Sequence, residues 1–91
     1  MLNISEIIAK VFETNGEPIE IHISDGVNAC EFTGIVVLNT EIKALQFWQG
    51  RNAAYPAIQV SDLESIEIKN DTDWNPVTEK LVYRRYIEIK Y

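Results

Sequence analysis

The stretch from Ile19 to Ile68 constrains the fold most, because apolar and polar residues alternate there in short runs separated by Gly, Asn or Asp. Alternation with a period of two predicts strands with one buried face, and the separating residues are typical of turns. Gly34 interrupts the longest run, and a glycine inside a strand indicates a bulge or a sharp bend. The pattern therefore predicts a small, strongly bent barrel over residues 18–69, with strands at 19–24, 30–39, 44–48, 56–60 and 65–68.

A helix is predicted before these strands, over residues 3–15. Asn3 is a favourable N-cap, Glu6 is spaced to complete a capping box, and Asn15-Gly16 can end the helix in the left-handed conformation. Its apolar residues recur with the helical period and form one stripe, made of Ile4, Ile7, Ile8, Val11 and Phe12. We expect the stripe to cover an open face of the barrel, and the alternative is that it docks a partner.

The C-terminal part lies outside the barrel pattern. Residues 70–79 are polar and predict a surface loop, and residues 80–90 alternate again and predict an additional C-terminal strand. The apolar face of that strand is interrupted by Arg85, so we expect it to be partly uncovered in a monomer. The turn at residues 61–63 is predicted to be 3₁₀. The 91 residues are expected to form a single domain, mainly β, with one N-terminal α-helix.

The charge and the cysteine content restrict the class of partner and the cellular compartment that we expect. The net charge of −6 disfavours nucleic acid unless the basic residues are segregated, and the last twelve residues do carry four of them. Cys30 is the only cysteine, which excludes an internal disulfide and fits a reducing compartment. No apolar run is long enough to span a membrane, and no signal peptide is recognisable. We therefore expect a cytoplasmic protein that does not bind membranes.

The order of helix, five strands with a bent second strand, and a 3₁₀ turn before the fifth resembles the Sm-like and SH3-like small β-barrels over residues 3–68. The Rho-inhibitor (Rof) family is similar in this order and in its acidity. The YolD-like family is similar in Tyr55-Pro56-Ala57-Ile58 and in residues 61–66, and the WYL domain in residues 44–48 and 63–66. The resemblance implies a five-stranded antiparallel barrel with a binding role, and it assigns no ligand.

No residue pattern points to catalysis. His22 is the only histidine and is predicted to be an ordinary surface residue of a strand. Residues 71–75 begin like a calcium loop, but Pro76 stands where such a loop requires glycine. Phosphate loops, zinc-type spacings and nucleophile motifs do not occur. We expect a protein that is not an enzyme and that uses neither a metal nor another cofactor.

Aromatic residues and arginines are the best candidates for a binding site. These types dominate protein interfaces, and they also stack on and neutralise single-stranded nucleic acid. The sequence therefore predicts a protein-interaction module, a small inhibitor or adaptor, that binds another protein through strand edges and forms a homo-oligomer, most simply a dimer. The alternative is a single-stranded nucleic-acid or nucleotide binder. The candidate residues are Trp48, Arg51, Tyr55, Trp74, Arg84, Arg85 and Tyr86.

Overall fold

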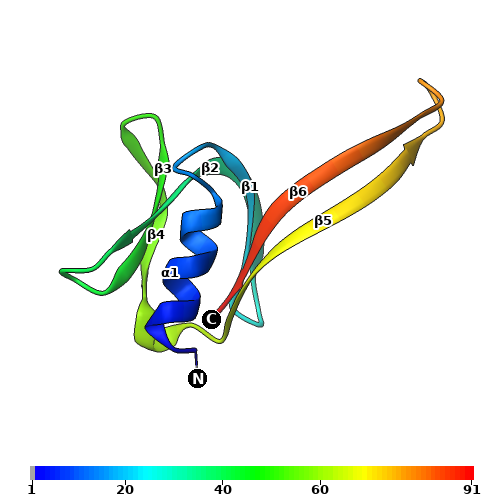
Figure 1. Cartoon of the computed structure of the whole chain (residues 1–91). Coiled ribbons are helices and arrows are strands. Elements are labelled where there is room, and N and C mark those ends of the chain that lie inside the picture. Colours follow the sequence, from blue (N-terminus) through cyan, green and yellow to red (C-terminus); the bar gives the residue numbers. More distant parts are fainter. Residues whose placement is uncertain (1) are drawn as a thin grey trace.

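The computed structural model describes residues 2–91, which form one helix and one six-stranded sheet (Figure 1). The strands lie side by side in the order β4-β3-β2-β1-β6-β5, and all neighbouring pairs are antiparallel except β1 and β6, which are parallel. The elements are α1 (Ile4–Glu13), β1 (Ile19–Ser24), β2 (Ala29–Asn39), β3 (Ala44–Gln49), β4 (Asn52–Gln59), the 3₁₀ turn η1 (Val60–Asp62), β5 (Ser65–Asn75) and β6 (Lys80–Lys90).

The sheet is mixed and open, so the predicted closed, five-stranded antiparallel barrel is not confirmed. The C-terminal strand causes the difference. Instead of being added outside a barrel, β6 lies between β1 and β5 and pairs with both, from Glu20↔Tyr86 to Ser24↔Lys90 on one side. Alternation along a sequence determines which face of a strand is buried, but it does not determine which strand lies next to it.

Gly34 is the point at which β2 changes partner. Its first half pairs with β1 and ends at Ile19↔Gly34, and its second half pairs with β3 from Ile35↔Trp48 onward. A Cβ atom at position 34 would lie 2.6 Å from the carbonyl oxygen of Trp48. Strand β2 continues through Gly34 and changes partner there, and the close approach of β3 explains why a residue without a side chain occupies this position.

Helix α1 lies across one face of the sheet and contacts β2 and β5. The predicted cap is confirmed, because the Asn3 side chain accepts a hydrogen bond from the Glu6 amide over 2.9 Å. Asn15 and Gly16, with φ of 55° and 66°, follow the helix in the left-handed region. Ile7 joins a buried core to which all six strands contribute. Within residues 2–91, no helix is long and apolar enough to cross a membrane.

The predicted loop at residues 70–79 is wrong over 70–75, where β5 continues. Thr72 pairs with Tyr83 and Trp74 with Leu81, so cross-strand pairing outweighs the low β propensity of the neighbouring Asn and Asp residues. Residues 70–85 pair only with each other, because β1 pairs with β6 only from Tyr86 onward. We call this projecting hairpin the arm, and Figure 1 shows it extending away from the rest of the molecule, the body.

Candidate interaction surface

One face of the arm carries an uncovered apolar patch toward its tip, beyond the polar residues Asn70, Thr72 and Arg85. Because side chains alternate across a strand, the face that carries the core residues Ile87 and Ile89 in the body carries Leu81 and Tyr83 in the arm, with Trp74 beside them on β5. Trp74 is 58% exposed, Leu81 54% and Tyr83 79%. The core face of the sheet thus continues into solvent beyond the end of α1.

Arg85 marks the boundary between the covered and uncovered parts of this face. Its guanidinium donates a hydrogen bond to the carbonyl oxygen of Glu13, in the last turn of α1, over 3.2 Å. A cation at a helix C-terminus is stabilised by the unpaired carbonyls and by the helix dipole. Arg85 therefore ends the covered face and connects α1 to the arm.

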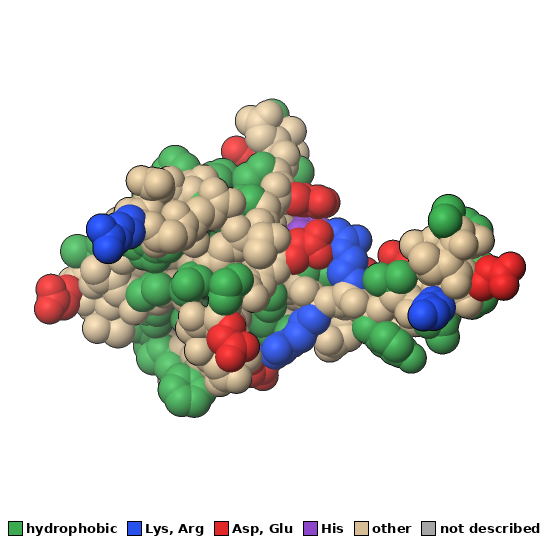
Figure 2. All heavy atoms as spheres, turned by 90° about the horizontal axis from the view of Figure 1, so that it is seen from above, with side chains coloured by type: hydrophobic (Ala, Val, Ile, Leu, Met, Phe, Trp, Pro, Cys, Tyr) green, Lys and Arg blue, Asp and Glu red, His purple; other side chains and the backbone are tan. Residues whose placement is uncertain are grey.

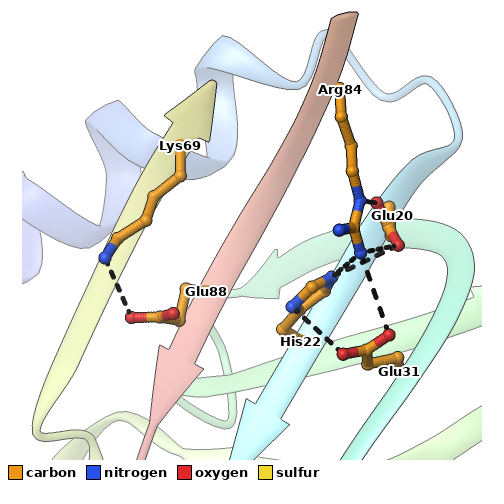
Figure 3. A network of polar contacts seen from close by, with 6 residues as sticks. All are labelled: Glu20, His22, Glu31, Lys69, Arg84 and Glu88. Carbon is orange, nitrogen blue, oxygen red and sulfur yellow. Dashed lines mark hydrogen bonds and ion pairs between the residues drawn. The ribbon is translucent and has the colours of Figure 1, made fainter. Parts of the chain in front are cut away.

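The opposite face of the sheet holds a network of charged side chains at the base of the arm (Figure 3). Arg84 of β6 donates two hydrogen bonds to the Glu20 carboxylate of β1, over 2.7 and 2.6 Å. The His22 ring stacks on Tyr86 with centroids 4.1 Å apart, and its two nitrogens lie 3.3 Å from a Glu20 oxygen and 3.6 Å from a Glu31 oxygen. These contacts connect three strands where the arm leaves the body.

The bidentate pair changes the ionisation of both of its members. The hydrogen bonds from Arg84 lower the pKa of Glu20 from 4.5 to about 2, and the same contact raises the pKa of Arg84. Arg84 and Glu20 are therefore both charged at neutral pH, and the guanidinium is already engaged by a carboxylate.

Three side chains of this network also have the chemistry of metal ligands. Ligand atoms of Glu20, His22 and Glu31 lie within 4.8 Å of one another. The Arg84 guanidinium stands against the same groups, 2.6 Å from Glu20, 3.3 Å from His22 and 3.9 Å from Glu31. A divalent cation could use these ligands only if Arg84 moved away, so the arrangement favours an internal ion-pair network over a metal centre.

The other predicted residues lie at the opposite end of the sheet. Trp48 is the penultimate residue of β3, and Arg51 is exposed in the turn that follows. Tyr55 packs against Phe47, and its hydroxyl shares a hydrogen bond of 2.7 Å with the Tyr91 hydroxyl. The strand order separates this group from the arm by β2 and β1. The structure therefore divides the seven predicted residues into two groups, with Trp74, Arg84, Arg85 and Tyr86 on or beside the arm.

The seven predicted residues include neither Leu81, which the sequence did not single out, nor Tyr83, which lies in the same run of aromatic residues and arginines as Arg84 and Tyr86. The helix stripe was expected to cover an open face of the barrel, with docking of a partner as the alternative. Phe12 is 79% exposed, and it borders an open groove of about 560 Å³ between α1 and β2. Figure 2 shows hydrophobic side chains at the surface of both the arm and the body. The sequence signal for the arm was weak on β5, because the apolar alternation of Ile66 and Ile68 stops at Asn70 and only Trp74 resumes it.

Comparison of the chain with protein-family models, with curated proteins and with solved structures gave no match.

Proposed function

We propose that this chain is a non-enzymatic protein-interaction module that binds another protein through the apolar face of its arm. The observation that carries the proposal is the exposure of Trp74, Leu81 and Tyr83 together on one face of a projecting hairpin. Trp and Tyr are enriched among the residues that dominate protein interfaces, because they bury a large area at a small cost in side-chain entropy. An exposed apolar patch of this kind marks an interaction site.

The shape of the arm supports the same function. An isolated two-stranded hairpin is marginally stable in water, and the contacts shown between the arm and the body, those of Arg84 with Glu20 and of Arg85 with Glu13, both lie at the base of the arm. Contact with a partner would remove the apolar face from water and stabilise the pairing of the two strands. The charged network on the other face keeps the base of the arm attached to the body in the absence of a partner.

Arg84 and Arg85 already bind other groups of the chain, which disfavours the binding of nucleic acid through them. Arg84 is held by Glu20, and Arg85 is held by the Glu13 carbonyl, so a phosphate would have to replace a carboxylate or a helix cap. Arg51, which is exposed, lies at the far end of the sheet. Binding of single-stranded nucleic acid or a nucleotide is therefore the alternative function, and the experiment below includes a titration that detects it.

We also propose that the body is an opened variant of the Sm-like or SH3-like small barrel. The helix, the partner change at Gly34 and the 3₁₀ turn η1 before β5 support this relation, and the insertion of β6 between β1 and β5 accounts for the opening. The free cysteine, Cys30, supports a reducing compartment such as the cytosol.

The proposal is tested by affinity capture from cells of the source organism, with the full chain as bait. Trp74→Glu and Leu81→Glu are expected to lose the bound proteins that the wild type retains, because a charge on the arm face cannot be buried. Val27→Glu is the matched control, since Val27 is 90% exposed in the β1–β2 turn and lies outside the arm. Circular dichroism establishes that each variant is folded.

Equal capture by the wild type and both arm variants would overturn the proposal. Fluorescence titration with single-stranded oligonucleotides and with mononucleotides at low salt runs in parallel. Quenching that saturates, with no protein captured through the arm, would establish the alternative function instead.

A further inference from the structure

We propose that the arm binds a second copy of this chain, seating its apolar face in the groove between α1 and β2 of that copy. This inference rests on the function proposed above and names the partner. Two features of the same chain carry it, a projecting apolar surface and an open apolar groove that nothing in residues 2–91 covers.

The groove is lined by the face of α1 that the sheet leaves uncovered. Its volume of about 560 Å³ lies in the range of roughly 300–1,000 Å³ that holds drug-sized ligands, so it has room for two or three large side chains. Ile8 and Phe12 on α1 and Val37 on β2 are exposed along it. The apolar walls are made of Ile8, Val11, Phe12, Val36, Val37 and Leu38.

Contact between the arm and the groove can produce a closed, symmetric dimer. The arm and the groove are separate surfaces of one chain, so the arm of each copy can enter the groove of the other about a two-fold axis. Each contact is then made twice, and no unpaired arm or groove remains. The projection of the arm, which gives the chain extents of 47 × 30 × 26 Å, provides the reach that such an exchange requires.

The apolar area involved approaches that of a stable dimer. A fully buried aromatic side chain removes about 150–250 Å² from water, and Trp74, Tyr83 and Phe12, which expose 58%, 79% and 79% of their surface, can each contribute roughly 100–200 Å². Leu81 and Ile8 add to this area, which brings each copy to several hundred Å², close to the roughly 800 Å² per partner of a standard interface.

Charge favours contact of the arm with a body over contact of two bodies. The arm carries three acidic residues, Asp71, Asp73 and Glu79, and three basic residues, Lys80, Arg84 and Arg85. The net charge of −6 therefore belongs entirely to the body. A neutral arm approaches an acidic body without the like-charge repulsion that two bodies experience.

The inference is tested by disulfide trapping in a Cys30→Ala background. Phe12→Cys and Leu81→Cys are made as separate variants, mixed in equal amounts and oxidised. The mixture is expected to form a cross-linked dimer, whereas each variant alone and the mixture of Leu81→Cys with Val27→Cys are not. Both replaced side chains are more than half exposed, so these variants are expected to fold.

Light scattering of the unmodified chain gives an independent readout. The wild type and Val27→Glu are expected to be dimeric at high micromolar concentration, and Phe12→Glu is expected to raise the dimer dissociation constant more than about tenfold. A monomeric wild type would overturn the inference, and so would cross-linking of Leu81→Cys with itself, which indicates contact between two arms.

The two proposals fail in different ways. Capture of another protein that depends on the arm, with a monomeric wild type, would refute the second copy and leave the interaction function standing. A dimer that is unaffected by Leu81→Glu would refute the role of the arm in the dimer, and only equal capture by the wild type and the arm variants would refute the interaction function.

Discussion

Replacement of Gly34 with Ala is expected to destabilise the protein, because β3 approaches β2 at that position. The added Cβ would lie 2.6 Å from the Trp48 carbonyl oxygen, where an ordinary contact begins at 3.4 Å. The two atoms must therefore separate by about 0.8 Å. The oxygen belongs to the backbone of β3, so the movement displaces the ladder that begins at Ile35↔Trp48.

The cost follows from two opposing effects. Insertion of a methyl group into a closely packed site destabilises the folded chain by about 1–3 kcal/mol. Alanine also lowers the conformational entropy of the unfolded chain relative to glycine, which stabilises the folded chain by about 0.4–1 kcal/mol. The net destabilisation is about 1–2 kcal/mol. A chain of this length has an unfolding free energy of roughly 5–14 kcal/mol, so the variant is expected to remain folded.

Urea unfolding followed by tryptophan fluorescence measures this loss. With a slope of about 2 kcal/mol per molar urea, the midpoint is expected to fall by roughly 0.5–1 M. Gly50→Ala is the comparison, because a Cβ there meets nothing within 4 Å and its cost comes only from a φ of 61°. An unchanged midpoint for Gly34→Ala would show that β3 yields freely and would refute close packing at the partner change.

Two further changes probe the base of the arm and the helix. Glu20→Gln is expected to lower the free energy of unfolding at pH 7, because it removes the ion pair with Arg84. The pKa of Glu20 is about 2 in the folded chain and 4.5 in the reference state. The stabilisation by this ion pair is therefore complete above pH 4.5 and is lost as the pH falls toward 2. Urea titration measures the free energy of unfolding of both proteins between pH 4.5 and pH 2. If the wild type and the variant lose the same amount over this range, the ionisation of Glu20 is not the source of the stabilisation. Asn3→Ala is expected to cost about 1 kcal/mol through the lost N-cap, while Ser5→Ala in the same turn stays within about 0.5 kcal/mol; equal thermal midpoints for the two would contradict the cap.

The local elements were predictable because their signals lie within a few residues of one another. The Asn3 cap and the alternation of β1 follow from short-range hydrogen bonding and from the period of two, and the structure has both. The faces of β6 were also predictable, since alternation assigns Ile87 and Ile89 to the core. Gly34 was recognisable as special without knowledge of its neighbour.

The candidate site was only partly predictable from residue type. Tyr and Trp are common in strands because they pack well there, and the same residues dominate interfaces. Tyr55 is half-buried against Phe47, whereas Tyr83 is 79% exposed, and nothing in the residue types distinguishes the two. Exposure depends on whether another element covers the face, which the order of the strands decides.

The sequence by itself determined that one helix is followed by strands, which face of β1 and β6 is apolar, and that Gly34 occupies a special position in β2. The tertiary structure alone decided that β6 enters the sheet between β1 and β5, that the sheet stays open, and that residues 70–85 project without cover. The physical reason is the distance along the chain over which each interaction acts. Capping and alternation act between residues close along the chain, while strand neighbours are selected by the burial of surfaces from distant segments, which no local pattern records.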